Sequence, residues 1–100
     1  MADSRVILVT GSSRGIGAGL VTGFANKGFR VAINYSKSAG EANTLSREIA
    51  EIAGQDRVMV IQCDVSKRRS VRDMFDSIIR KFGRVDVLVD NSIPHDKDLH

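Results

Sequence analysis

Four apolar runs alternate along the chain with three segments whose apolar residues recur at helical spacing. The four runs cover residues 5–10, 30–35, 57–63 and 84–89. Each run is rich in valine, isoleucine or leucine, which is typical of strands buried on both faces. The pattern therefore predicts the element order βαβαβαβ.

The three intervening segments carry apolar residues three and four positions apart, which predicts helices with one buried face. Glycines at positions 28, 54 and 83 are expected to end them. Ser38 followed by Glu41 matches a capping box for the second helix, and Ser66 is predicted to cap the third. The predicted buried stripes are Ile16, Leu20, Val21, Phe24 and Ala25; then Ala42, Leu45, Ile49, Ile52 and Ala53; then Val71, Met74, Phe75, Ile78, Ile79 and Phe82.

Strands that alternate with helices predict an α/β fold, here a four-stranded parallel sheet with helices on both faces. Because parallel crossovers are right-handed, we expect strand order 3-2-1-4, a partial Rossmann fold. Two helices would then cover one face and one helix the other. The fourth strand would lie at an edge, although residues 85–89 have the composition of an interior strand. We therefore expect a neighbour along this edge, either more chain or another copy in a homo-oligomer.

Composition limits the possible classes of protein. One hundred residues allow one small domain, and a net charge of +3 permits an anionic ligand without predicting nucleic-acid binding. Cys63 is the single cysteine, so no internal disulfide can form and we expect a reducing, cytoplasmic location. We interpret it as a small buried residue. No apolar run approaches the ~18 residues of a membrane span.

The most informative segment reads Thr-Gly-Ser-Ser-Arg-Gly-Ile-Gly at positions 10–17, between the first strand and the first helix. Gly11 would allow a sharp turn, Gly15 a close approach of the backbone to a pyrophosphate, and Gly17 tight helix packing. The helix N-terminus would offer N–H groups and partial positive charge to the phosphates. These features predict dinucleotide binding, and the alternative is a purely structural glycine turn.

This segment resembles the Thr-Gly-x-x-x-Gly-x-Gly signature of the short-chain dehydrogenases/reductases. The resemblance extends over residues 5–93 and is greatest to 3-oxoacyl-acyl-carrier-protein reductases. It implies a dinucleotide-binding portion at 1–93, and we expect residues 94–100 to be a loop or frayed tail. It also implies hydride transfer between a nicotinamide and a small carbonyl, acyl or alcohol substrate.

The end of the second strand bears on which dinucleotide binds. Residues 34–38 read Asn-Tyr-Ser-Lys-Ser and lack the acid that usually holds the ribose diol of NAD. Arg14 could reach a 2′-phosphate as a fork-shaped donor, and in the resembling family an arginine there goes with NADP. We therefore expect NADP, the alternative being that Arg14 and Lys37 are solvated charges.

Two further positions are implied mainly by the resemblance. Asp64 would accept a hydrogen bond from the adenine amino group, and Val65 would offer its backbone N–H; alternatively, Asp64 begins a loop or caps a helix. Asn91 matches part of the family's Asn-Asn-Ala-Gly segment. The predicted cofactor-binding residues are Gly11, Ser13, Arg14, Gly15, Ile16, Gly17, Asn34, Tyr35, Ser36, Asp64, Val65 and Asn91.

The chain lacks the catalytic residues that the resemblance implies. The family's serine, Tyr-x-x-x-Lys pair and further asparagine follow the fourth strand, whereas Tyr35 is the single tyrosine here and Ala39 stands four positions later. Ser92 and Ile93 also depart from the Asn-Asn-Ala-Gly segment. We therefore expect the 100-residue chain alone to bind dinucleotide weakly and to catalyse no turnover. The alternative is a truncated, non-catalytic module that acts in binding or assembly.

Other ligands are less well supported by the residues. His95, Asp96, Asp98 and His100 lack the spacing of metal ligands, and we expect a solvated tail. The basic residues at 67–69 and Arg72 come without an aromatic platform, so a solvated helix face is favoured over nucleic-acid binding. An S-adenosylmethionine enzyme is disfavoured because residues 34–38 carry no acid.

Overall fold

The observed elements follow the predicted order. The computed structural model describes residues 4–91. Its elements are β1 (Val6–Val9), α1 (Gly15–Asn26), β2 (Arg30–Tyr35), α2 (Ala39–Ala53), a 3₁₀ turn (Gln55–Arg57), β3 (Val58–Gln62), α3 (Arg68–Phe82) and β4 (Val87–Val89). The predicted tail at 94–100 lies outside the described residues.

The four strands form one parallel sheet in the order β3-β2-β1-β4, which confirms the predicted topology. Ile7 of β1 is aligned with Val31 of β2 on one side and with Val87 of β4 on the other. The order of strands reverses between β1 and β4, because the chain builds outward from β1 in one direction and then returns. In open α/β sheets, ligands bind at the carboxyl ends of the strands beside such a reversal.

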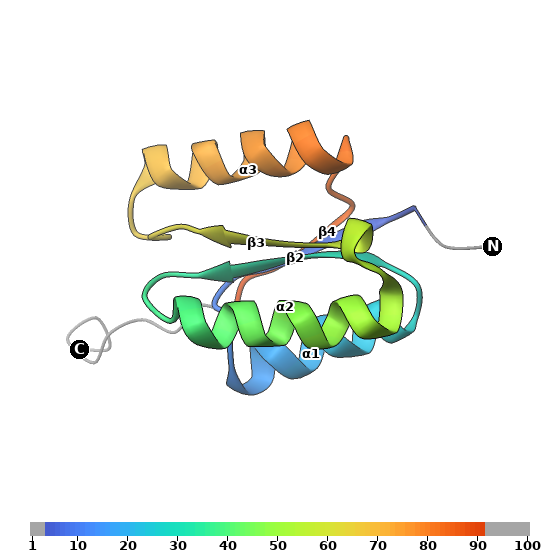
Figure 1. Ribbon diagram of the computed structural model, residues 1–100. Helices are drawn as coiled ribbons and strands as arrows, with labels where there is room; N and C mark the ends of the chain where they lie inside the picture. The colour runs from blue at the N-terminus through green and yellow to red at the C-terminus, as the bar shows by residue number, and fades with distance from the viewer. Residues whose placement is uncertain (1–3, 92–100) are drawn as a thin grey trace.

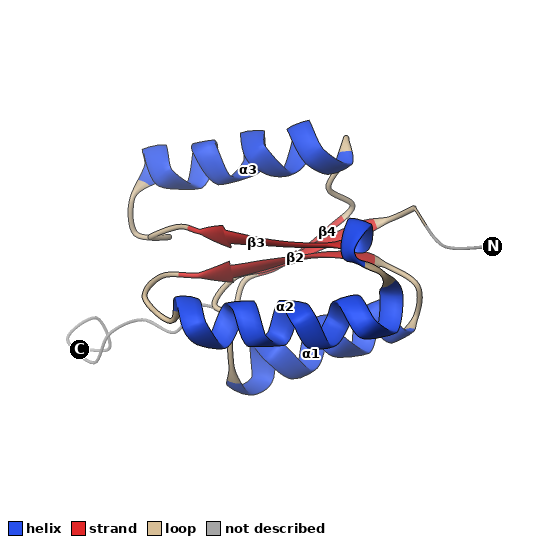
Figure 2. Ribbon diagram, viewed as in Figure 1, coloured by secondary structure: helices blue, strands red, loops and turns tan. Residues whose placement is uncertain are grey.

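The sheet lies between two layers of helix, α1 and α2 on one face and α3 on the other, as predicted (Figure 1 and Figure 2). Successive strand residues point to opposite faces, so each strand contributes to both layers of core. The α1–α2 face includes Ile7, Val9, Val31 and Ile33, and the α3 face includes Val6, Leu8 and Ala32. All of β1 and the four central residues of β2 are buried, which explains the apolar runs at residues 5–10 and 30–35.

Three residues of the predicted buried stripes are exposed instead. Ile16 is 77% exposed, Ile52 51% and Ile79 47%. Each of these helices packs against the sheet with one side only, so residues at the margin of an apolar stripe lie beyond the contact. The residues that do reach the core at the centre of each stripe include Val21, Ile49 and Ile78.

Both predicted serine caps are absent. Ser38 precedes α2 but makes no capping hydrogen bond through its side chain, and the Glu41 carboxylate lies near Arg14 instead. Lys67, rather than Ser66, occupies the position before α3. The Ser66 hydroxyl instead donates to the Asp64 carboxylate at 2.6 Å.

The predicted fourth strand is shorter than expected and lies at the sheet edge. The Asp86 N–H donates to the Val6 carbonyl at 2.9 Å, and the Asp86 carboxylate accepts the Val6 N–H at 2.8 Å, so a side chain replaces one main-chain acceptor just before the paired residues that begin at Val87. Leu88 is 53% exposed, while its two neighbours in β4 are half-buried. Within the part of the chain that is described, β4 pairs with β1 alone.

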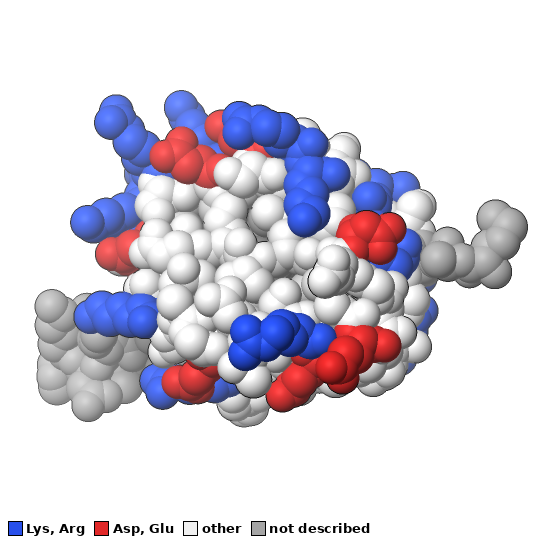
Figure 3. All heavy atoms as spheres, in the orientation of Figure 1, with Lys and Arg blue, Asp and Glu red and all other residues white. Residues whose placement is uncertain are grey.

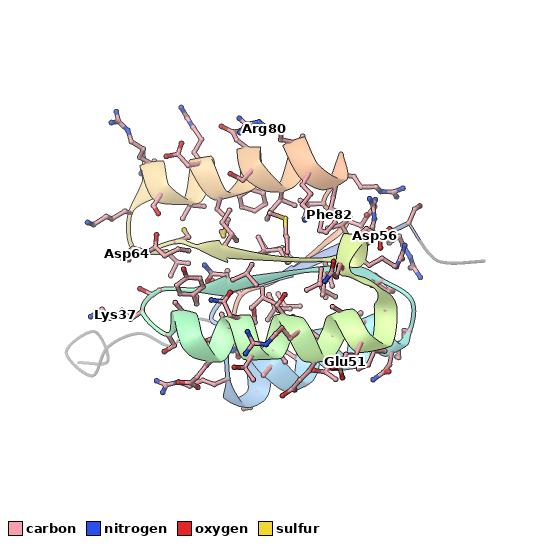
Figure 4. All side chains as sticks on the ribbon, in the orientation of Figure 1. Lys37, Glu51, Asp56, Asp64, Arg80 and Phe82 are labelled. Carbon is pink, nitrogen blue, oxygen red and sulfur yellow. The ribbon has the colours of Figure 1, made fainter. Side chains whose placement is uncertain are left out.

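The surface carries mixed charge. Figure 3 shows Lys and Arg side chains projecting along the α3 layer, and the basic residues at 67–69 and Arg72 are exposed. Figure 4 shows that Arg80 points away from α3 while Phe82 turns toward the sheet. Within residues 4–91, no helix combines the length and the apolarity that a membrane crossing requires.

Two adjacent isoleucines can test which side of α3 packs against the sheet. Ile78 is 0% exposed and Ile79 is 47% exposed. We expect Ile78→Ala to lower the free energy of unfolding by about 2–5 kcal/mol, because it leaves a cavity under the sheet, and Ile79→Ala by less than about 1 kcal/mol. Urea denaturation followed by circular dichroism measures both. Equal losses would contradict the observed orientation of α3.

Candidate dinucleotide-binding site

The turn between β1 and α1 lies at the carboxyl end of the sheet, beside the reversal of strand order. Gly11 and Gly15 have φ angles of +60° and +64°. Side chains with a Cβ are strained in this left-handed region, so both positions need glycine. This conformation turns the chain off β1 and directs the N-terminus of α1 toward the end of the sheet.

One face of the turn is anchored to β2 through Asn34. The side-chain oxygen of Asn34 accepts the Gly11 N–H at 2.9 Å, and its backbone carbonyl accepts the Ser12 N–H at 2.9 Å. The Asn34 N–H in turn donates to the Ser12 hydroxyl at 3.0 Å. Its side-chain NH₂ group lies 3.4 Å from three carbonyl oxygens, those of Tyr35, Ile61 and Cys63.

Asn34 has a structural role at this turn. It is 2% exposed, and its amide group is engaged by the turn and by β3. Its contact with the cofactor stays a prediction. A buried amide that is satisfied by main-chain groups is a structural support. Ser12, which is 0% exposed, is the second support of the turn, and spacing alone offers no signal for either pairing.

The other face of the turn is anchored to the end of β4. The Thr10 hydroxyl donates to the Asp90 carboxylate at 2.9 Å and accepts the Asn91 N–H at 2.9 Å. The Asn91 side chain donates to the Gly11 carbonyl at 3.2 Å. The structure thus brings Asn91 to the predicted turn and adds Thr10 and Asp90, which sequence reasoning missed because the partners are 80 residues apart.

Gly17 brings the helix close to this anchored turn. A Cβ at position 17 would lie 2.6 Å from the Gly11 carbonyl oxygen, 2.7 Å from the Asn91 side-chain nitrogen and 2.8 Å from the Ser12 Cα. The atoms closest to this position therefore belong to the turn and to Asn91, whereas the sequence predicts close packing on the strands. By contrast, a Cβ at Gly15 would meet no described atom within 4 Å, so space is open beside this part of the backbone.

The main-chain amides of the turn divide into two groups. Those of Gly11 and Ser12 donate to Asn34 and are therefore not available to a ligand. Among described residues, no protein acceptor takes the N–H groups of residues 13–17. The first turn of α1 also lacks an acid. Free N–H groups and the positive end of the helix dipole fit an anionic group such as a pyrophosphate.

Arg14 stands at the N-cap position of α1 with its side chain in solvent. Its guanidinium is 3.8 Å from the Glu41 carboxylate, and the two side chains are 73% and 52% exposed. Ile16 and Ser13 lie beside it on the same turn, Ile16 exposed and Ser13 half-buried. The turn therefore presents one cation next to its free amides.

The ends of β2 and β3 lie at the same edge of the sheet. Tyr35 is half-buried there, while Ser36 is exposed and its carbonyl accepts the Gln62 side chain at 3.2 Å. Figure 4 shows Lys37 and Asp64 at this shared end. Residues that are far apart in sequence therefore surround the region beyond β2 and β3.

Asp64 begins the turn that follows β3. Its carboxylate accepts the Ser66 hydroxyl at 2.6 Å and the Ser66 N–H at 3.0 Å, and these two bonds lower the pKa of the Asp64 carboxyl below its ordinary value. Val65 is 38% exposed. Asp64 therefore has a local hydrogen-bond partner in Ser66. This agrees with the alternative in which Asp64 begins a loop, and it leaves the adenine contact as a prediction.

The remaining candidates do not extend the site. Cys63 is 0% exposed and its sulfur accepts a hydrogen bond from the Ser70 hydroxyl at 3.3 Å, which confirms that the cysteine is buried. In the described portion, no three His, Cys, Asp or Glu side chains come together in a group that could hold a metal ion. The histidine-containing tail and Ser92 and Ile93 lie outside that portion.

The segment that forms this turn and the four-stranded sheet matches a known family. The model of the short chain dehydrogenases matches residues 5–96. The chain belongs to the short-chain dehydrogenase family. The Bacillus subtilis short-chain dehydrogenase/reductase homolog YusS is 40% identical over 89 residues, which cover 89% of this chain and 80% of that protein.

Solved structures of the family share the fold described above. A short chain dehydrogenase from Burkholderia cenocepacia in complex with NADP superposes with a TM-score of 0.84 at 38% identity, over 90% of this chain and 36% of that one. Elsinochrome reductase 1 of Elsinoe fawcettii is 39% identical over 90% of this chain. This chain spans 33% of that reductase and 31% of a tetrahydroxynaphthalene reductase of Pestalotiopsis fici.

The close approach at Gly17 of this short-chain dehydrogenase can be tested against another glycine of the same helix. We expect Gly17→Ala to lower the free energy of unfolding by about 1–3 kcal/mol because the new methyl group overlaps the turn. Gly19→Ala is the matched control, because a Cβ there meets no described atom within 4 Å, and it should raise stability by about 0.5–1 kcal/mol. Urea denaturation compares them, and a neutral Gly17→Ala would refute the close approach.

Proposed function

We propose that this chain is the NADP(H)-binding portion of a short-chain dehydrogenase/reductase. The observation that carries the proposal is the β1–α1 turn, where the N–H groups of residues 13–17 have no acceptor within the described chain and lie at the carboxyl end of the sheet. A diphosphate placed there would accept several of these donors. Gly11, Gly15 and Gly17 maintain the conformation, and Asn91 supports it from β4.

The choice of NADP rests on charge near the expected adenosine ribose. Residues 34–38 carry no acid, and Arg14 is exposed at the start of α1. A guanidinium fork suits a phosphate group, whereas the ribose diol of NAD is usually held by a carboxylate. Ser36 and the hydroxyl of Tyr35 would be further donors, and Asp64 with Val65 would face the adenine. A relative at 38% identity was solved with NADP, which supports this choice.

The reaction proposed for the whole enzyme is hydride transfer between the nicotinamide and a small carbonyl, acyl or alcohol substrate. Two relatives are named as reductases, a tetrahydroxynaphthalene reductase and an elsinochrome reductase. The bound nicotinamide would supply the hydride chemistry, and the residues described here would bind and orient the nucleotide. Since Tyr35 is not followed by a lysine four positions later, we assign no catalytic residue within this chain and expect it to catalyse no turnover by itself.

A second candidate function is assembly through β4, as a non-catalytic module. Leu88 is 53% exposed on a strand that pairs on one side within the described residues. An apolar sheet edge favours association with a further strand. In this case the chain would form a homo-oligomer, independently of whether it binds the dinucleotide.

The role of Arg14 is tested by titrating the chain with NADPH and NADH and following nicotinamide fluorescence. We expect weak binding of both with tighter binding of NADPH, and Arg14→Ala should weaken NADPH binding by about five- to tenfold while leaving NADH almost unchanged. Arg80→Ala, on the outer surface of α3, is the matched control and should change neither. Equal affinities for the two nucleotides in the unmodified chain would contradict the NADP proposal.

The assembly function is tested by analytical ultracentrifugation. We expect the unmodified chain to self-associate with increasing concentration, and Leu88→Lys to shift the equilibrium to monomer because a charge at the exposed centre of β4 opposes strand addition. Ile52→Lys replaces another exposed apolar residue, on α2, and should leave association unchanged. A chain that stays monomeric at every concentration would exclude the assembly function.

A further inference from the structure

The structure places an acid beside the cation that is proposed to bind the 2′-phosphate. Glu41 belongs to the first turn of α2, beyond the strand end where an acid is usually sought. Its carboxylate lies 3.8 Å from the Arg14 guanidinium. The two residues approach because α1 and α2 lie side by side on one face of the sheet (Figure 1), which brings the start of α2 next to the start of α1.

Glu41 does not act in the capping box that the sequence predicts for it. In a capping box its side chain would turn back to the Ser38 N–H, but Ser38 adopts φ −99° and ψ 60° and makes no capping hydrogen bond with its side chain. Glu41 instead lines the groove between α1 and α2 together with Ser13, Gly40 and Thr44. The charged group that its carboxylate contacts is the Arg14 guanidinium.

We propose that Glu41 is a specificity-determining residue that weakens binding of a 2′-phosphate by competing for Arg14 and repelling the phosphate. The inference rests on the proposed function, because Arg14 must first be the group that binds this phosphate. A phosphate monoester carries about −1.5 to −2 charges at neutral pH, so it and the carboxylate both attract the guanidinium and repel each other. A nucleotide without the 2′-phosphate lacks this conflict.

The size of the effect follows from exposure. The two side chains are 73% and 52% exposed, so water and salt screen their interaction. An exposed ion pair contributes little binding free energy, so we expect loss of this pair to change the affinity for the phosphate by about two- to fivefold. Glu41 would therefore reduce the preference for NADP(H) without reversing it.

The experiment uses two nucleotide fragments, so that the nicotinamide end of the site does not enter. Adenosine 2′,5′-bisphosphate and AMP are titrated into the 100-residue chain at low ionic strength. Binding is followed by the NMR chemical shifts of the backbone amides of residues 4–91. We expect Glu41→Gln to tighten binding of the bisphosphate about two- to fivefold and to leave AMP unchanged. The gain should shrink in 0.5 M salt because the Debye length is then only about 4 Å.

Two further variants test whether the gain depends on the position of the carboxylate and on the presence of Arg14. Glu48→Gln removes a carboxylate from the same groove, farther along α2, and should leave both affinities unchanged. In an Arg14→Ala background, the gain from Glu41→Gln should fall below about twofold because the contested cation is gone. An undiminished gain in that background, or an equal gain from Glu48→Gln, would overturn the proposed competition for Arg14.

The outcomes also distinguish this inference from the proposed function. If the unmodified chain binds the bisphosphate no better than AMP, or if Arg14→Ala has no effect on it, the NADP proposal fails and the inference fails with it. If Arg14→Ala weakens binding but Glu41→Gln leaves it unchanged or weakens it, the NADP proposal stands and the role of Glu41 is overturned.

Discussion

The glycine-rich turn between β1 and α1 depends on one buried amide side chain. Asn34, at the end of β2, receives the Gly11 N–H on its side-chain oxygen and the Ser12 N–H on its backbone carbonyl, while its NH₂ group faces β3. Because the residue is 2% exposed, loss of the amide would leave the Gly11 N–H without its protein acceptor in a partly buried place. The shape of the turn is therefore determined by a strand that is distant in sequence.

This anchoring explains how the turn can be held by the sheet and still offer hydrogen-bond donors. The two amides that face β2 are satisfied internally, and Thr10 and Asn91 connect the turn to the end of β4. The positive φ angles of Gly11 and Gly15 turn the chain at the carboxyl end of β1. The amides of residues 13–17 then have no acceptor among the protein groups that the structure describes. A site organised before its ligand arrives loses less conformational entropy on binding.

The fold was largely predictable because its main signal is periodic. Buried strands and half-buried helices repeat at different spacings, and handedness then selects one strand order. Errors occurred where a single side chain had two possible partners. Ser38 and Glu41 have the spacing of a capping box, but the packing of α2 against α1 gives Glu41 a cationic neighbour in Arg14. Local spacing contains no information about such a neighbour.

The sequence by itself determined the order of elements, the glycines that the turn requires and the absence of an acid at residues 34–38, since each depends on residue type and short-range geometry. Only the tertiary structure decided which amides have an acceptor among the described residues, that Asn34 supports the turn, and that Glu41 lies beside Arg14. Those features arise from contacts between β1, β2, β4 and two helices, and a contact between distant segments exists only after the chain has folded.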